Sequence, residues 1–576
     1  MKKFLLGILC GIVIAVLCGV ILLFSAIRMA STRPVIADNS LLVLRLEGEV
    51  PEKAPVEIPL PAFEEQSHIT VRDIWSGLRR AAADSRVKGV LIAPRRLEIG
   101  WGKMQEIRDA LVAFKKSGKP VYALLRFPDA HSYYIATAAD KIYAGPEDYL
   151  DLKGLRVEAV FLKGTLNKLG VQMEVIHAGK YKDAYNMFTR TSMSPETREV
   201  LNQILDDYFR NLTETIAAGR KKDAGTVQQL INQGPFVAKD ALQAGLLDAL
   251  GYEDQAVGDL QSRVKQSSLK KVEARDYLRG LAPDVGRTKI ALLVAEGTIT
   301  QGSAEQGFGG EEGIKSGSFS KLIRQLKSDS TIKGVILRVD SPGGDAIASD
   351  DILHEMKELS RGKPVVVSMS DLAASGGYYI SVTGDPIVAY ANTLTGSIGV
   401  ITAKPNLRGL YDKLGISKEL LTRGKFAAID SDYKPLDDAE KAKLEESVEA
   451  TYRGFIDRVA AGRHKTFDQI AAVAQGRVWV GVQAKENGLV DRLGGLDAAV
   501  EMMRQRARLS ATEKIDLVPY PPRRSLFDVL MSRPDESAMA EAQLNVVLRR
   551  IPGGRWIRPV LEGGLLALMP YSVEVR

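Results

Sequence analysis

The chain has 576 residues, 45% of them apolar, and a formal net charge of +7. That length and apolar content can fill several cores and correspond to roughly three or four domains. The positive charge is spread without a dense basic block, which excludes a nucleic-acid-binding stripe and leaves ordinary solvated surface charge.

The N-terminus carries an uncharged apolar stretch, Phe4–Ile27, preceded by Lys2 and Lys3. As a helix it would reach about 36 Å, enough to span a hydrocarbon core of ~30 Å. A cleavable signal peptide has a shorter apolar region of ~7–15 residues, so we predict an uncleaved signal anchor over residues 4–27. Lys2 and Lys3 on one side oppose Arg28 and Arg33 on the other, and the terminal amine tips the balance toward an N-terminus inside, with the rest of the chain outside the cytoplasm.

Both cysteines, Cys10 and Cys18, fall within the predicted anchor. We therefore expect no disulfide, no cysteine nucleophile and no thiolate metal site in the rest of the chain. There is also no His-Glu-x-x-His zinc motif and no Gly-x-Ser-x-Gly motif. The sequence predicts neither a metal nor a cofactor.

Strand and helix patterns alternate along the chain, which predicts an α/β fold with parallel strands. In chain order we expect strands Leu41–Leu46, Gly89–Ile92, Val121–Leu125, Ile290–Val294, Gly334–Val339 and Val365–Met369, and helices Val71–Asp84, Lys103–Lys116, Phe319–Ser328 and Ala348–Leu359. We expect flexible segments at Glu47–Ser67, at Gln301–Ser318 and after Pro521. The glycine-rich part of the second, Gly307–Gly317, lacks the lysine of a phosphate-binding loop.

The alternation repeats, because sequence blocks recur at an offset of about 245 residues. The block starting at Val87 matches the one starting at Ile332, and Tyr133-Tyr134-Ile135 matches Tyr378-Tyr379-Ile380. Further along, the Gly245–Gly251 block matches Gly488–Gly494 with a drift of two residues. We predict two homologous domains, at 38–285 and 288–520, followed by a tail at 521–576 of unknown role.

The two predicted domains differ at the positions that could carry chemistry. Ser375 corresponds to Ala130 in the first domain, whereas Lys182 corresponds to Ala427 in the second. The first domain also lacks counterparts of Pro342-Gly343-Gly344, where it has Leu97-Glu98-Ile99, and of Ser397, where it has Leu152. Each domain thus holds what the other lacks, as expected for one site shared between them.

Ser375 is the candidate nucleophile, but a serine hydroxyl needs a base within hydrogen-bond reach. Gly376 and Gly377 permit a tight turn after it, and the next residues would begin a buried helix. Pro342-Gly343-Gly344 follows a predicted strand and would expose backbone N–H groups. Such donors can hold an oxyanion, which contributes roughly 3–4 kcal/mol each.

A lysine is the candidate base, because none of the five histidines lies in a recurring motif or beside a paired acid. A lysine can act as a base when burial disfavours its charged form. Lys182 lies next to Tyr181, with further apolar side chains nearby. Lys180 competes for the role, but it faces Lys425 in the other domain, and a lysine kept in both domains indicates a structural role. That favours Lys182.

These motifs together resemble the long, duplicated form of the bacterial signal peptide peptidase A family, also called protease IV. The resemblance is carried by Ala374–Tyr379, Gly396–Gly399, Pro342–Gly344 and Tyr181–Ala184 followed by Met193-Ser194-Pro195. It implies two Clp protease/crotonase-like ββα-spiral domains. It further implies Ser375 as nucleophile, Lys182 as general base, Ser397 as the lysine-orienting residue, and Gly344 with Gly376 as the oxyanion hole.

The same resemblance implies a single-pass protein of the inner (cytoplasmic) membrane with its catalytic domains on the periplasmic side. Family members of this length form tetramers and degrade signal peptides and other apolar peptides. Two other classes stay open: a crotonase-like acyl-CoA enzyme, and a catalytically inactive membrane scaffold. The sequence also leaves open whether Ser375 and Lys182 meet within one chain or between chains.

Overall fold

The computed structural model describes Gly11, Leu17 and residues 33–54, 69–281, 287–303, 313–522 and 564–569. Apart from two positions, the predicted anchor at 4–27 lies outside the described residues. Within the described ranges, no helix is both long and apolar enough to cross a membrane.

The first half of the chain is built on a parallel sheet with the strand order β8-β4-β3-β2-β1-β9. The middle parts of its central strands, residues 41–44, 90–92 and 121–125, are apolar and buried, as expected for parallel strands covered on both faces. The strands are β1 (Ser40–Gly48), β2 (Val87–Leu97), β3 (Val121–Leu125), β4 (Lys141–Ala144), β8 (Ala249–Leu250) and β9 (Lys270–Glu273).

Amphipathic helices cover this sheet. In α2 (Val71–Ala83), Thr70 and Asp73 form a capping box, and Ile74 and Leu78 point into the core. The other helices of this half are α3 (Trp101–Lys115), α4 (Ala130–Ala136), α5 (Lys163–Leu169), α6 (Asn186–Thr189), α7 (Pro195–Arg220), α8 (Ala224–Gln233), α9 (Ala238–Gln243), α10 (Glu253–Arg263) and α11 (Ala274–Gly280), and β5 (Tyr149–Leu150) pairs with β7 (Phe236–Val237).

The second half repeats this architecture on a sheet with the order β19-β17-β15-β13-β10-β21. Its strands are β10 (Thr288–Glu296), β13 (Ile332–Ser341), β15 (Val365–Ala374), β16 (Ile387–Ala389), β17 (Leu394–Gly396), β19 (Val478–Val480), β20 (Arg492–Leu493) and β21 (Ile515–Tyr520). Its helices are α12 (Ser316–Ser328), α13 (Ala346–Ser360), α14 (Gly376–Tyr379), α15 (Arg408–Leu414), α16 (Asp438–Arg463), α17 (Phe467–Val473), α18 (Gly481–Glu486) and α19 (Leu496–Arg506). Each expected strand and helix is present, and α7 and α16 share a length of 26 residues.

A third sheet is shared by both halves, with the order β12-β11-β14-β22-β18-β6. Only β6 (Gln172–Ala178) comes from the first half, where it pairs with β18 (Val400–Asn406). The others are β11 (Thr298–Thr300), β12 (Gly313–Lys315), β14 (Gly343–Asp345) and β22 (Leu566–Leu568). The last of these comes from the C-terminal tail and lies between β14 and β18, antiparallel to both.

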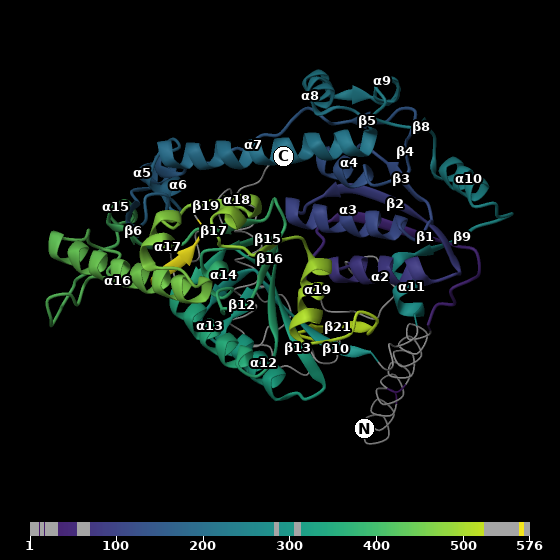
Figure 1. Cartoon of the computed structure of the whole chain (residues 1–576). Coiled ribbons are helices and arrows are strands. Elements are labelled where there is room, and N and C mark those ends of the chain that lie inside the picture. The colour runs from purple at the N-terminus through teal and green to yellow at the C-terminus, as the bar shows by residue number, and fades with distance from the viewer. Residues whose placement is uncertain are drawn as a thin grey trace, which may run out of the picture.

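Buried charges also join the halves. Arg338 on β13 contacts Glu52 at 2.8 Å and Glu106 at 2.9 Å, and all three side chains are almost completely buried. Asp371 on β15 accepts hydrogen bonds from the Gly100 and Lys103 backbone amides, and so caps the start of α3. In Figure 1, α7 runs along one side of the molecule, and it contacts both α4 and β19.

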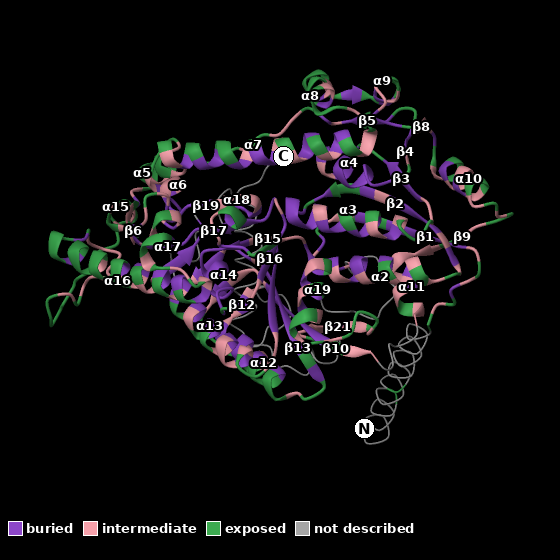
Figure 2. Ribbon diagram, viewed as in Figure 1, coloured by how far each residue is buried: buried purple, intermediate pink, exposed green. Residues whose placement is uncertain are grey.

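Burial follows this layout: the strands and the inner faces of the helices are buried, and the outer helix faces are exposed (Figure 2). Two expectations of flexibility are partly wrong. Residues 313–318, within the expected flexible segment Gln301–Ser318, form β12 and the start of α12, because Ile314 packs in the core. The tail after Pro521 includes β22, whose residues are buried.

Candidate active site

Ser375 lies where β15 ends and α14 begins, in a left-handed conformation with φ 55°. Its backbone N–H donates to the Gly396 carbonyl at the end of β17. A non-glycine residue in this region is strained and persists only where its surroundings hold it. The sharp turn fixes the direction of the Ser375 side chain, which is completely buried.

Neighbouring segments approach the backbone beside Ser375 so closely that glycine is required there. A Cβ on Gly344, which has φ +154°, would lie 2.0 Å from the Ile299 carbonyl oxygen. A Cβ on Gly376 would lie 2.7 Å from Ser349 Oγ. Gly343, on the same strand as Gly344, has φ +96°, and a Cβ there would lie 2.5 Å from the Gly376 nitrogen. Any larger residue would therefore push β14 away from the Ser375 turn.

Lys182 comes from the first half, in the turn after β6. The turn is held against the second half by a hydrogen bond from the Tyr181 backbone N–H to the Gln475 carbonyl, at 2.8 Å. The Lys182 side chain is completely buried. Its Nζ lies 2.6 Å from Ser375 Oγ, 2.8 Å from the Ser397 carbonyl oxygen and 3.0 Å from Ser397 Oγ.

Burial lowers the pKa of Lys182 well below its ordinary value. The three oxygens around Nζ belong to neutral groups and do not offset the loss of hydration. A neutral amine has two N–H donors and one lone pair. Three contacts therefore match its capacity, with the two donors directed to Ser397 and the lone pair available to the Ser375 hydroxyl.

The predicted site residues thus come together within one chain. Lys182 contacts both Ser375 and Ser397, and Gly344 and Gly376 lie on the two backbone segments that flank the serine. The competing lysine, Lys180, lies away from the serine. Its side chain is 58% exposed, with Glu196 4.0 Å from its Nζ.

Two groups that support the lysine were missed by sequence reasoning. Asp183 accepts hydrogen bonds from Ser194 Oγ and Thr197 Oγ1, each at 2.6 Å, and so ties the lysine turn to the start of α7. A Cβ on Gly476, which has φ +73°, would lie 2.7 Å from the Lys182 backbone nitrogen. The adjacent motif Met193-Ser194-Pro195 could have indicated the first group, whereas nothing local indicates Gly476.

The strand β22 lies between β14 and β18 and contacts α14, the helix that begins after Ser375. Hydrogen bonds at both ends hold this strand: the Met569 N–H donates to the Pro342 carbonyl, and the Ala346 N–H donates to the Leu565 carbonyl. Leu566 and Leu568 pack against Tyr185 and Phe188, which follow the lysine. The structure therefore contains a peptide strand beside the Ser375–Lys182 pair.

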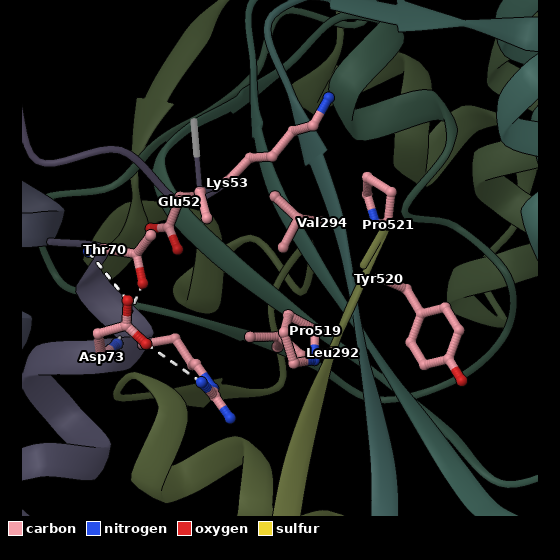
Figure 3. A pocket seen from close by; sticks show the side chains of 11 residues that line it. Glu52, Lys53, Thr70, Asp73, Leu292, Val294, Pro519, Tyr520 and Pro521 are labelled. Atoms are coloured by element: carbon pink, nitrogen blue, oxygen red, sulfur yellow. Dashed lines mark hydrogen bonds and ion pairs between the residues drawn. The ribbon is translucent and has the colours of Figure 1, made fainter. Parts of the chain in front are cut away.

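A pocket lies at the junction of the halves, lined by Glu52, Lys53, Ala54, Thr70, Arg72, Asp73, Leu292, Val294, Pro519, Tyr520 and Pro521 (Figure 3). Its polar groups are largely engaged in structure. Thr70 caps α2 by accepting the Asp73 backbone N–H, and the Asp73 carboxylate pairs with Arg72. The lining residues include neither the serine nor the lysine, so this pocket adds nothing to the candidate site.

Comparison with known proteins agrees with this geometry. Residues 113–267 and 357–510 each match Peptidase family S49. The chain is 35% identical to the chloroplastic serine protease SPPA of Arabidopsis thaliana, over 86% of this chain and 73% of that protein. It is 33% identical to protease 4 of Salmonella typhi, over 76% and 72%, and 32% identical to protease 4 of Haemophilus influenzae, over 82% and 77%.

The chain therefore belongs to peptidase family S49, and its relatives mark it as a serine peptidase of the SppA type. The resemblance drawn from the sequence is confirmed, and so is the tandem arrangement of α/β domains, since the family matches twice. A solved ClpP1 variant from Listeria monocytogenes is similar with a TM-score of 0.24 and 15% identity over 36% of this chain and 94% of that chain. That likeness is too low to bear on the fold.

Proposed function

We propose that this chain is a membrane-anchored serine endopeptidase that uses a Ser375–Lys182 dyad. The observation that carries the proposal is the 2.6 Å contact between Lys182 Nζ and Ser375 Oγ, formed where burial lowers the pKa of the lysine. A neutral amine at hydrogen-bond distance from a serine hydroxyl is the arrangement that nucleophilic catalysis requires.

In the acylation step, the neutral Lys182 amine takes the proton of the Ser375 hydroxyl as Oγ attacks a peptide carbonyl carbon. The resulting ammonium has three N–H donors, which match Ser375 Oγ and the two oxygens of Ser397. Ser397 thus orients the amine before transfer and stabilises the ammonium after it. The ammonium then protonates the leaving amine of the substrate.

The oxyanion formed on the carbonyl would be held by the backbone amides of Gly344 and Gly376. Both amides belong to segments whose close packing excludes side chains, so the donors are fixed before the substrate binds. In the second step, Lys182 removes a proton from water as the water oxygen attacks the acyl carbonyl carbon. The ammonium then returns that proton to Ser375 Oγ as the ester bond breaks and the carboxylic acid product leaves.

Apolar peptides in extended conformation are the substrate class that the groove fits. The edges of β14 and β18 pair with a strand that is antiparallel to both, and two alternate side chains of that strand, Leu566 and Leu568, pack in an apolar cluster. We propose cleaved signal peptides and other apolar peptides as substrates. On the family resemblance, we further propose that residues 4–27 anchor the chain in the membrane and that the catalytic region lies in the periplasm. The same resemblance supports two Clp-like spiral domains and a homotetramer.

Hydrolysis of an apolar peptide ester by purified protein tests the dyad. Ser375→Ala and Lys182→Met should each lower kcat/KM by at least about a thousandfold, because either change removes a group that acts only in the reaction. Lys180→Ala is the matched control and should leave kcat/KM within about twofold of the parent. A Lys182→Met protein of parental activity would refute the mechanism.

The same variants separate the alternative functions. Turnover of an acyl-CoA by Ser375→Ala protein would favour the crotonase-like enzyme over the peptidase. A parent chain that neither hydrolyses the ester nor reacts with an acylating serine probe would favour the inactive scaffold.

A further inference from the structure

We infer that residues 564–569 of the tail are an intramolecular inhibitor that occupies the substrate groove of the same chain. The inference rests on the proposed function, because it assigns the groove between β14 and β18 to the peptide substrate. The strand β22 is the last described element, and its position completes a sheet that would otherwise have a gap beside Ser375.

The register of β22 is that of a substrate. Its pairs with β14 are Gly343–Leu568, Gly344–Ala567 and Asp345–Leu566. The residue pairs Pro342–Met569 and Ala346–Leu565 on either side are joined by hydrogen bonds. Because hydrogen-bonded pairs alternate along an antiparallel ladder, Gly344 and Ala567 form the hydrogen-bonded pair between them. The Ala567 carbonyl is thereby directed to the Gly344 amide, which is one of the two proposed oxyanion donors.

The position of the Ala567 oxygen supports this register. It lies 2.1 Å from where a Cβ on Gly343 would be, and 3.1 Å from the corresponding point on Gly376. The carbonyl therefore approaches both glycine segments that flank Ser375. A peptide that entered from outside would have to place its own scissile carbonyl in the same space.

Burial indicates that β22 closes the site. The side chains of Ser375, Lys182 and Ser397 are all 0% exposed while the strand is in place. Leu566 and Leu568 are also almost fully buried, against Tyr185, Phe188 and Ile401. On the other face of the strand, Ala567 packs into the core of the second half. A completely buried nucleophile cannot reach an external peptide until the strand leaves.

Binding of this strand is intramolecular, so a substrate must compete with a segment that is always nearby. The apparent affinity for a substrate is then reduced in proportion to the fraction of molecules with an open groove. Release of the strand should therefore act chiefly on KM and on the rate of serine labelling.

The test compares full-length proteins that differ only in the tail. Leu566→Asp/Leu568→Asp introduces two carboxylates into an apolar environment. Ala567→Pro removes the backbone N–H of residue 567 from the ladder between β22 and β14 and alters the shape of the strand there. Both should raise kcat/KM for a short peptide ester roughly tenfold or more and speed acylation by a serine probe. Leu421→Asp, at a site 91% exposed, is the matched control and should leave both rates unchanged.

A synthetic peptide with the sequence of residues 564–569 provides the test in trans. It should inhibit the Leu566→Asp/Leu568→Asp protein competitively, whereas a scrambled peptide should not. If both tail variants are folded by their melting temperatures but hydrolyse the ester and react with the probe at the rates of the parent, the inference is wrong and the proposed function is unaffected. A parent and variants that all fail to hydrolyse esters and to react with the probe would instead overturn the proposed function.

Discussion

Lys182 is the residue on which the proposed chemistry depends, and its environment explains how an amine can act as a base. The side chain reaches from a turn of the first half into the second half, where, among the described residues, its Nζ contacts neutral oxygens of Ser375 and Ser397. Burial therefore acts on its pKa without compensation from an anion. A carboxylate in place of either serine would restore the charge and remove the base.

The pH dependence of activity follows from this shift. A base acts in its neutral form, so kcat/KM should rise with pH as Lys182 deprotonates and should level off well below the ordinary pKa of 10.5. The measurement is a pH–rate profile with the peptide ester for the parent and for Lys180→Ala, which should show the same rising limb. A profile that is flat across the acidic and neutral range would contradict the assignment of Lys182.

The same pKa shift has a consequence for stability. Between the lowered native pKa of Lys182 and the ordinary value of 10.5, the native state binds fewer protons than the unfolded chain, so this group costs stability as the pH falls through that window. Lys182→Met, which keeps the length of the side chain, should therefore raise the melting temperature at neutral pH. A variant with a higher melting temperature is folded, so its loss of activity would not come from misfolding.

At the scale of elements, the lysine turn depends on glycine contacts that come from another part of the chain. Gly476 has φ +73° and lies against the backbone of Lys182, while Gly399 lies near its side chain. Asp183 secures the other side of the turn through Ser194 and Thr197. The base is thus held by packing and hydrogen bonds rather than by its own helix or strand.

Gly476→Ala tests this packing. The substitution adds left-handed strain and an overlap with backbone, and it should destabilise the protein by about 2–4 kcal/mol and lower kcat. Gly415→Ala is the matched control: its φ is +71°, but nothing lies within 4 Å of the added Cβ. It should cost only about 1 kcal/mol and leave kcat unchanged. Equal effects in thermal melts and assays would show that packing against Lys182 is unimportant.

Much of this site could be predicted from sequence, because the duplicated halves differ at complementary positions. Ser375, Lys182, Ser397 and the glycine pair follow from comparing the halves and from the family motifs. Gly476 could not be predicted, because its contact with Lys182 joins residues far apart in the sequence. The strand β22 could not be predicted either: Leu565–Met569 is a short apolar run, and only the edges of β14 and β18 make it a strand.

At the scale of the whole molecule, buried charges fix how the two halves dock. Arg338 is completely buried between Glu52 and Glu106 and also donates to Ser368 and Ser370. Its charge holds the pKa of Glu52 below the ordinary value, whereas burial raises that of Glu106 to about 7. The Arg338 charge therefore favours the ionised form of Glu52, whereas at Glu106 the effect of burial is larger than the effect of that charge.

Arg338→Met should uncouple the halves. It removes the cation that contacts both buried carboxylates, and we expect a loss of about 3–5 kcal/mol in the free energy of unfolding, measured by denaturant titration. Arg324→Met removes an exposed pair with Glu355 and should cost less than about 1 kcal/mol. Adding Glu52→Gln and Glu106→Gln to Arg338→Met should recover part of the loss, and failure to do so would assign the effect to packing alone.

The proposed dyad forms within one chain, which mixing experiments can check. Ser375→Ala and Lys182→Ala proteins are mixed, and subunit exchange is verified. The mixture should hydrolyse the ester no faster than either variant alone. Wild-type protein exchanged with Ser375→Ala protein should keep activity in proportion to its share. Activity recovered from the two inactive parents would place the dyad between chains.

The separation of the two proposed catalytic residues along the chain bears on biosynthesis. Ser375 and Lys182 lie 193 positions apart, on halves that each need their own core. A polypeptide interrupted anywhere before the serine, or a fragment released by breakage between the halves, carries at most one member of the pair. Peptide hydrolysis would then begin only once synthesis has passed the second half and both halves have docked, which protects the cell from incomplete copies of its own protease.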